Sequence, residues 1–295
     1  MTDFQARLKE NGDRVTQALD ALLPRPQGPE TRLIEAVRYA ALAGGKRLRP
    51  FLVMEVGALF DADETSLIRT ATAIECVHTY SLVHDDMPCM DDDDLRRGQP
   101  TVHRKYDEPT ALLVGDALLT FAFEILSEPP THRDPQMRCR LITGLAKAAG
   151  VGGMVGGQAA DMAPEEIGSD LIAVTRMNRM KTGALINFAV DAGALIGLAS
   201  DAQRAALNRY AHDVGLAFQM VDDILDAEGV VRDTGKAVGK DVDRGKVNFV
   251  TVLGVAQTKE RVRMLTDQSK RHLGLFGGRA RLLLDTVDFI LERRY

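Results

Sequence analysis

The sequence contains no tryptophan, few aromatic residues and few cysteines, and each shortage excludes a class of protein. Aromatic residues make up 5% of the 295 residues. Alternating strand-like runs are also scarce, so an all-β chain is disfavoured. Cys76, Cys89 and Cys139 are odd in number and lack metal-ligand spacing. Such cysteine usage is typical of a reduced compartment, and we expect a cytoplasmic protein.

Long apolar runs and a positive charge balance are absent as well. The first fifteen residues, MTDFQARLKENGDRV, are polar, so we expect no secretory signal. No charge-free apolar run reaches about 18 residues, so we expect no membrane span. The net charge of -5 argues against nucleic acid as a partner. An acidic protein can still bind anions through local Lys/Arg clusters or through metal ions that bridge carboxylates to phosphates.

Apolar residues recur at three- and four-residue spacing along nearly the whole chain, which predicts helices. Polar, proline-containing or glycine-containing breaks separate these segments at 24–29, 44–45, 87–90, 127–135 and 228–248. No repeat of fixed period is visible. We therefore expect an all-α fold, with residues 1–295 forming a single-domain bundle of roughly ten or more helices.

The first segment with chemical potential is acidic. Residues 84–98, HDDMPCMDDDDLRRG, contain six aspartates followed by two arginines. Acidic runs usually form solvated surface, but this one follows an apolar helical stretch. Carboxylates gathered at the end of a buried helix repel one another unless a hard cation lies between them. Asp85 and Asp91 are six residues apart and do not share a helical face, but a bend at Pro88 could bring them together.

A second acidic cluster, FQMVDDILDAEG, covers residues 218–229. Asp222 and Asp226 are four residues apart and therefore lie on one helical face, where like charges cost a few tenths of a kcal/mol. A metal ion would reverse the sign of that contribution. The alternative is an amphipathic helix with an exposed acidic edge. Two such clusters in one helical chain make coincidence a poorer explanation.

Cationic residues form the complementary feature. AGGKRLRP at 43–50 combines two glycines with Lys46, Arg47 and Arg49 and is similar to an anion cradle, although it is not a Walker sequence. The alternative is a basic helix start at the surface. Lys181 and Thr182 interrupt an apolar helical run, where lysine usually extends to solvent.

Two further features allow either a structural or a functional interpretation. His78 lies on the apolar helix before the first acidic cluster, where a lone histidine is more often a core residue. The glycine-rich segment 152–161 indicates close helix packing or backbone approach to a ligand.

Several signatures of other enzyme classes are missing. The chain has no GxSxG, HExxH, cysteine-pair metal site or dinucleotide fingerprint. Acidic clusters suited to magnesium, together with Lys/Arg donors for phosphate oxygens, favour a reaction in which a diphosphate leaves.

The motifs GGKRLRP, DDMPCMDDDDLRRG, KTG, FQMVDDILD and GKAVGKD occur in this order between about residue 30 and about residue 255. In combination they resemble those of the trans-prenyl diphosphate synthases. The two extra residues between the first aspartate pair and Asp91 are similar to those of the bacterial farnesyl diphosphate synthases. One departure is visible: Val247-Asn248-Phe249 follows Lys246, where the family usually has Lys-x-Thr-Tyr.

The resemblance implies a helical bundle around a central cavity, usually as a homodimer, that holds three magnesium ions. Its implied metal-binding residues are Asp85, Asp91 and Asp222, with Asp86 and Asp226 close by. Its implied catalytic residues are these five together with Asp223, Arg96 and Lys181. The allylic diphosphate would contact Arg96, Lys181, Thr182, Gln219, Lys236 and Lys246. Isopentenyl diphosphate would contact Lys46, Arg49, His78 and Arg97.

The implied activity is condensation of isopentenyl diphosphate with dimethylallyl and geranyl diphosphate to give farnesyl diphosphate. It would proceed by magnesium-assisted ionisation, carbocation condensation and proton elimination. Tyr80 and Ser81 precede Asp85 by five and four residues, which places them roughly 6–8 Å along the helix. Ser81 falls near the Asp85 face, and only the resemblance makes Tyr80 a floor that stops growth at fifteen carbons. The alternatives are a twenty-carbon synthase, a class I terpene cyclase and an inactive helical partner subunit.

Overall fold

The structure is a computed structural model that describes residues 2–168, 170–228 and 247–292. It is built almost entirely of helices, so the predicted all-α class is confirmed. The chain divides into two compact units, and the single domain predicted over 1–295 stays a prediction. Of the described residues, the first unit comprises 2–54 and Asp63–Ile142, and the second comprises Glu55–Ala62 and the chain from Thr143 onward.

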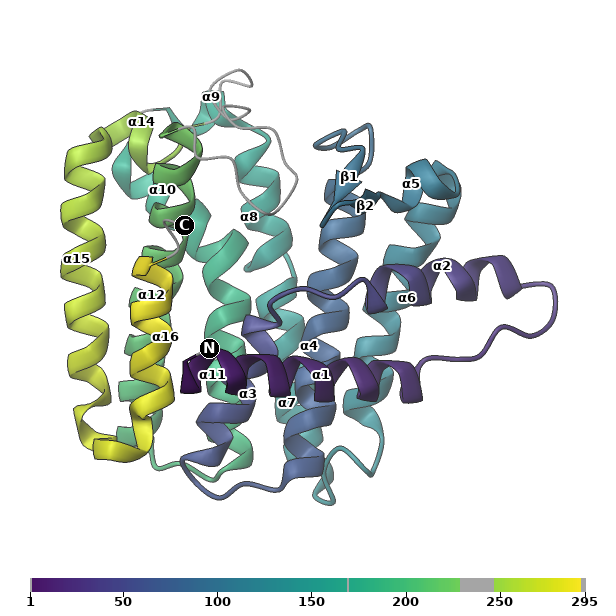
Figure 1. The fold of residues 1–295 in the computed structure, drawn as a ribbon, viewed down its shortest axis with the longest axis horizontal. Coiled ribbons are helices and arrows are strands. Elements are labelled where there is room, and N and C mark those ends of the chain that lie inside the picture. The colour runs from purple at the N-terminus through teal and green to yellow at the C-terminus, as the bar shows by residue number, and fades with distance from the viewer. Residues whose placement is uncertain (1, 169, 229–246, 293–295) are drawn as a thin grey trace. The chain divides into compact units, whose positions relative to one another are not determined.

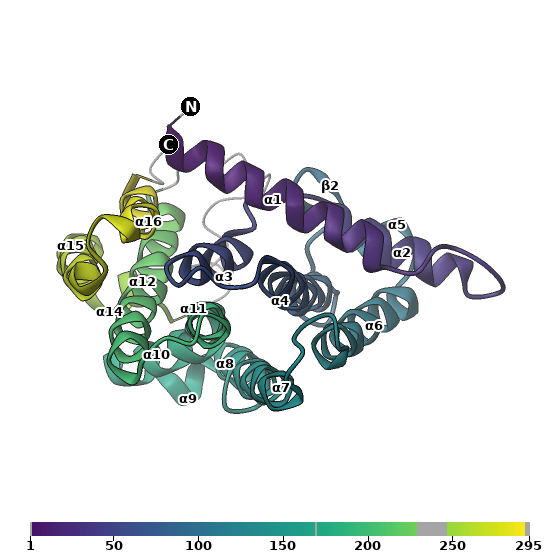
Figure 2. The same cartoon turned by 90° about the horizontal axis from the view of Figure 1, so that it is seen from below.

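The first unit is organised around one long apolar helix, α4. This helix packs along α6 and also contacts α1 and α2 (Figures 1 and 2). The unit contains α1 (Asp3–Leu22), α2 (Thr31–Leu42), the start of α3 (Leu48–Ala58), α4 (Glu64–Asp85), β1 (Leu95–Arg96), β2 (Gln99–Pro100), α5 (Val102–Lys105), α6 (Glu108–Ser127) and the start of α7 (Pro135–Ala149).

The second unit is organised around α12, which contacts α11, α15 and α16. It contains the remainder of α3 and α7, then α8 (Met154–Asp161), α9 (Pro164–Ile167), α10 (Leu171–Asn178), the π-helical turn η1 (Arg179–Gly183), α11 (Ala184–Ile196), α12 (Asp201–Ala227), α14 (Phe249–Leu253), α15 (Val255–His272), the 3₁₀ segment η2 (Leu273–Ala280) and α16 (Arg281–Glu292).

Helix boundaries follow the local sequence signals. The break at 24–29 separates α1 from α2, and Pro50 lies in the first turn of α3, where a missing N–H costs nothing. The side chains of Asp63 and Asp107 accept hydrogen bonds from the backbone N–H groups of the first turns of α4 and α6. Ser200 begins α12 with a reciprocal capping box.

Helix α6 has an unusual composition. Among the residues that the structure describes, it is the one helix whose length and hydropathy would suffice to cross a membrane. One face, including Val114, Leu118 and Ala122, is buried within the first unit, whereas Leu112 and Leu113 on another face are about half exposed.

Candidate active site

The chain after α4 folds back onto the end of that helix. The backbone N–H of Asp91 donates to the carbonyl of Asp85 at 2.8 Å, and that of Asp93 donates to the carbonyl of Asp86 at 3.2 Å. The predicted bend at Pro88 is therefore confirmed. It brings the backbones of Asp85 and Asp91 together although six residues separate them.

The aspartates of this first cluster differ in burial. Asp86 and Asp93 are buried, Asp85 and Asp91 are half-buried, and Asp92 is exposed. The buried pair faces one guanidinium group, that of Arg96. The sequence alone did not distinguish these roles, because all six aspartates look alike in the run.

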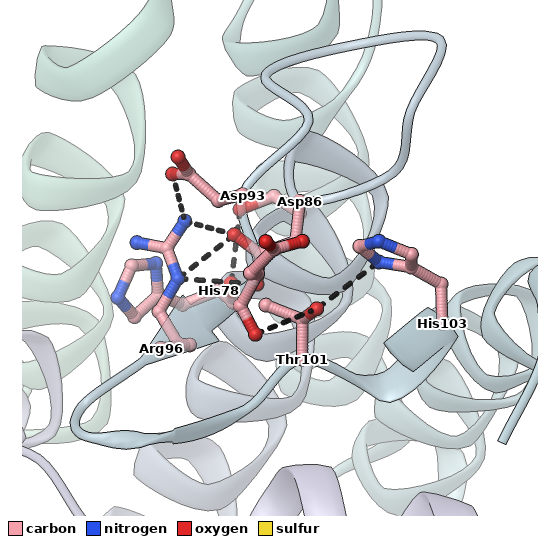
Figure 3. Close-up of polar contacts among 8 residues, drawn as sticks. His78, Asp86, Asp93, Arg96, Thr101 and His103 are labelled. Carbon is pink, nitrogen blue, oxygen red and sulfur yellow. Dashed lines mark hydrogen bonds and ion pairs between the residues drawn. The ribbon is translucent and has the colours of Figure 1, made fainter. Parts of the chain in front are cut away.

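Arg96 is held between the two buried carboxylates (Figure 3). Its Nε lies 3.0 and 3.1 Å from the two oxygens of Asp86, its Nη2 also bonds Asp86, and Nη2 lies 3.8 Å from Asp93 Oδ2. Burial acts to lower the pKa of Arg96, but the hydrogen bond and charge of Asp86 outweigh it and raise that pKa. Arg96 is therefore a fixed cation. Asp93 helps to hold it, a role that was not predicted from the sequence.

Arg97 is presented by a tight hairpin between β1 and β2. Arg97 and Gly98 form its two-residue loop and both have positive φ, 55° and 74°, as a turn with the twist of a β-hairpin requires. The Arg97 guanidinium donates to the carbonyl of Gly44. It also packs on Gly45, where a Cβ atom would lie 2.5 Å from Arg97 Cζ. The two glycines of the basic segment thus admit an arginine from the acidic segment.

His78 lies among the cations of the first unit. Burial, with the charges of Arg49, Arg97, Arg47 and Arg96, lowers the pKa of His78 well below its ordinary value. The imidazole is therefore neutral at physiological pH. His78 interacts electrostatically with Arg49 and Arg97. Three of the four residues predicted to contact isopentenyl diphosphate are therefore grouped together. The fourth, Lys46, is exposed in the loop before α3.

Arg47 has a structural role, unlike the role predicted for its cationic neighbours Lys46 and Arg49. Its side chain is buried in an ion pair with Glu75 of α4, and it donates to the carbonyl of Ala41 at 2.7 Å. The pair fastens the basic loop to α4. Glu75 gave no signal in the sequence, because it is one acid within an apolar helix.

Tyr80 and Ser81 lie on α4 as their spacing predicts. Tyr80 is buried, and its ring makes an edge contact with His84 at 5.8 Å between centroids. Burial and the nearby Asp85 carboxylate raise the pKa of Tyr80. The Ser81 hydroxyl donates to the carbonyl of His78 within the helix. Tyr80 therefore contributes a neutral, bulky ring close to the first acidic cluster.

The second cluster lies on α12 and shows the same division by burial. Asp222 and Asp226 are half-buried, and Asp223 is buried. Asp223 accepts hydrogen bonds from the side chain of Gln219 and from the backbone N–H of Phe249, each at 2.9 Å. Two of the predicted site residues on this helix, Gln219 and Asp223, are thus directly bonded.

Lys181 and Thr182 lie in the π-helical turn η1, so the predicted interruption of the helix is confirmed. Such turns are frequent at functional sites. Lys181 Nζ lies 2.6 Å from Asp161 Oδ2, and the Thr182 hydroxyl donates to Gln219 Oε1 at 3.1 Å. A Cβ atom on Gly157 would lie 2.1 Å from the backbone nitrogen of Lys181. The glycine-rich segment therefore serves close helix packing, and it also brings Asp161 to Lys181.

Asn248, the visible departure from the family pattern, has a structural role. Its side chain accepts from the Thr251 N–H at 2.9 Å, and the Thr251 hydroxyl accepts from the Asn248 N–H, forming a capping box at the start of α14. Asparagine and threonine are both effective N-caps, so the departure preserves this role. Lys236 and Lys246 lie outside the described residues.

The donor chemistry of both clusters suits magnesium. Among the described residues, no group of three or more His, Cys, Asp or Glu side chains is arranged to hold a metal ion. Magnesium, however, usually binds through one or two carboxylates together with substrate phosphates and water. Half-buried carboxylate pairs, Asp85 with Asp91 and Asp222 with Asp226, fit that requirement.

Comparisons with known proteins identify the family to which the chain belongs. The model of the family described as polyprenyl synthetase matches residues 30–273. The farnesyl diphosphate synthase of Escherichia coli is 43% identical over 99% of both chains. Geranylgeranyl pyrophosphate synthase 11 of Arabidopsis thaliana is 38% identical over 99% of this chain and 82% of its own. A solved structure of an FPP/GFPP synthase from Zymomonas mobilis is 44% identical, with a TM-score of 0.89 over 98% of this chain and 99% of that one. The chain therefore belongs to the polyprenyl synthetase family.

Proposed function

We propose that the protein is a farnesyl diphosphate synthase, which condenses isopentenyl diphosphate with dimethylallyl and then geranyl diphosphate. The observation that carries the proposal is the pair of acidic clusters, each with two half-buried carboxylates. Arg96 is paired with the first cluster, and Lys181 precedes Thr182, which is hydrogen-bonded to Gln219 beside the second. The 43% identity to the Escherichia coli enzyme across the full length supports the fifteen-carbon product. An inactive partner subunit would be expected to lack one of the two aspartate motifs, and both are intact.

Magnesium would be held by Asp85 and Asp91 in the first unit and by Asp222 and Asp226 in the second. Three ions per active site is the expected number from the family resemblance. When bound, magnesium supplies positive charge that stabilises the departing diphosphate. The remaining chemistry depends on what the side chains of the chain bind and orient.

Arg96, Lys181, Thr182 and Gln219 would bind the allylic diphosphate. Arg96 and Lys181 are held by carboxylates, so they meet the substrate as preorganised cations that need little reorganisation during ionisation. The carbon–oxygen bond then breaks, and the electron pair leaves with the diphosphate. The double bond of isopentenyl diphosphate attacks the resulting carbocation, and loss of a proton to the released diphosphate completes the condensation.

Lys46, Arg49, Arg97 and His78 would bind the isopentenyl diphosphate. The neutral His78 can donate one hydrogen bond without adding charge to a cluster that already holds several guanidinium groups. This group of donors also distinguishes a synthase from a class I terpene cyclase, which has no second diphosphate to bind. We further propose a cytoplasmic location, on the basis of cysteine usage.

The direct test is incubation of the protein with isopentenyl diphosphate, magnesium and one of the five-, ten- or fifteen-carbon allylic diphosphates. We expect turnover with the five- and ten-carbon allylic diphosphates and a fifteen-carbon product, identified by chromatography after dephosphorylation. Product from the fifteen-carbon substrate would instead indicate a twenty-carbon synthase. Formation of cyclic hydrocarbons in the absence of isopentenyl diphosphate would indicate a cyclase. No product from any substrate would refute the proposed enzymatic activity.

Tyr80→Ala is expected to lengthen the product from fifteen toward twenty or more carbons. The substitution removes a buried ring on α4 near the site of the first acidic cluster, which opens space for a growing chain. Chromatography of the dephosphorylated products measures the change. Tyr80→Phe keeps the ring and should keep the fifteen-carbon product, whereas an unchanged distribution in Tyr80→Ala would show that Tyr80 is not the floor.

We also propose that the chain forms a homodimer through α6. Leu112 and Leu113 expose about half of their apolar side chains on this helix, and an adjacent apolar pair is better covered by a second copy than left in water. Leu113→Asp is expected to shift the mass measured by light scattering after gel filtration from dimer to monomer. Met264→Asp, at a similarly exposed position on α15, is the control and should stay dimeric. A wild-type protein that is monomeric at every concentration would contradict the proposal.

A further inference from the structure

Asp223 differs from the other two aspartates of its motif. It is 3% exposed, whereas Asp222 and Asp226 on the same helix are half-buried. A carboxylate this deeply buried has to be compensated by donors, because an unpaired buried charge is strongly unfavourable. The structure supplies two of these donors within the second unit.

The first donor is the side-chain amide of Gln219, whose Nε2 lies 2.9 Å from Asp223 Oδ1. The other end of that amide, Oε1, accepts the Thr182 hydroxyl at 3.1 Å. An ionised carboxylate can only accept hydrogen bonds. Asp223 therefore forces Gln219 to point its nitrogen inward and its oxygen at Thr182, and it excludes the flipped amide.

The second donor is the backbone N–H of Phe249, 2.9 Å from Asp223 Oδ2. Phe249 is the first residue of α14 and is fully buried. The first N–H groups of a helix have no partner within it, and the Asn248 side chain caps the N–H of Thr251 rather than that of Phe249. Asp223 thus ties the start of α14 to α12 through a charge-assisted hydrogen bond.

We propose that Asp223 is a positioning residue rather than a magnesium ligand, and that it sets the donor and acceptor directions of Gln219 and Thr182. The inference rests on the proposed function, in which Gln219 and Thr182 contact the allylic diphosphate. Asp223, which the family resemblance implies to be catalytic, thereby acts through two neutral side chains. Asp222 remains the metal-binding member of the pair.

The test is a double-substitution cycle of Asp223→Asn, Gln219→Glu and the two combined. In Asp223→Asn, the new amide keeps its oxygen on the Phe249 N–H and directs its nitrogen at Gln219, so the Gln219 amide must flip and present Nε2 to Thr182. In the combined variant, the amide nitrogen introduced at position 223 donates to the carboxylate introduced at position 219. That carboxylate again accepts the Thr182 hydroxyl. The network and its total charge are restored with the donor and acceptor exchanged.

We expect each single substitution to weaken binding of geranyl thiolodiphosphate, an analogue that does not ionise, by about tenfold or more in calorimetry. The combined variant should lose less than the product of the two single losses, with a coupling of about fivefold or more. The magnesium concentration for half-maximal turnover should be unchanged in Asp223→Asn. Asp222→Asn, the matched neighbour, should raise that concentration.

Two results would overturn the inference: losses that multiply without coupling, or a magnesium requirement in Asp223→Asn that rises as in Asp222→Asn. If Asp223→Asn lowers the thermal unfolding midpoint too far for binding measurements, Gln219→Leu removes the link to Thr182 and leaves the Phe249 contact intact. It should weaken analogue binding without a comparable loss of stability, and unchanged binding would count against the proposal. Absence of prenyl transfer by the wild-type protein would refute the proposed function alone, because the coupling is measured without turnover.

Discussion

Asp85→Ala is expected to lower kcat by about a thousandfold or more, the largest effect on activity of any single substitution that we propose. Asp85 is a half-buried carboxylate at the end of α4, and the chain folds back there to bring the backbone of Asp91 against it. Removing one ligand of a catalytic metal costs several kcal/mol of transition-state stabilisation, and each 1.4 kcal/mol is about tenfold in rate.

Asp92→Ala is the matched control for this prediction. It removes the same charge seven residues later in the same cluster, but Asp92 is exposed. Steady-state rates at saturating magnesium and substrates should separate the two variants, with Asp92→Ala within a few-fold of wild type. Equal losses in both variants would mean that the cluster acts through its total charge rather than through a specific ligand.

Arg47→Met is expected to lower the free energy of unfolding by about 3–5 kcal/mol, the largest effect on stability. The side chains of Arg47 and Glu75 are 1% and 2% exposed. Removing one member of a buried ion pair leaves the other as an uncompensated charge. Both arginine and methionine have a Cβ, so the positive φ of 47° at this position affects the two residues similarly.

The combined variant Arg47→Met/Glu75→Leu separates charge from packing. Replacing a buried pair with apolar residues of similar volume is often close to neutral, so most of the lost stability should return. Denaturant unfolding of the wild type and the variants measures this. A combined variant no more stable than Arg47→Met would show that the hydrogen bond to Ala41, rather than the pair, supports the loop.

Much of the fold and part of the site could be predicted from the sequence. The helical periodicity, the break at 24–29 and the bend at Pro88 depend on residues close together in the chain, and such signals are legible without a structure. The order of the motifs was sufficient to indicate the family. The interruption at Lys181 was also visible, because Lys181 and Thr182 fall within an apolar run.

The contributions that the sequence did not reveal are pairings between distant residues. Glu75 with Arg47, and Asp161 with Lys181, join residues 28 and 20 positions apart, and the residues next to each acid do not indicate its partner. The division of the aspartates by burial was equally hidden. Neighbours such as Asp222 and Asp223 have the same chemistry and differ only in the direction in which their side chains leave the helix.

The π-helical turn at Arg179–Gly183 has a consequence for the length of the chain. Such a turn is equivalent to one extra residue within an α-helix. Deleting Met180 would therefore allow α10 to run into α11 without interruption. The backbone would be regular, yet either Lys181 or the following helix would rotate by about 100° relative to its present neighbours. The spacing through this turn should therefore be treated as fixed in sequence alignments and deletions. A shorter and more regular helix would lose the present orientation of Lys181 or of α11.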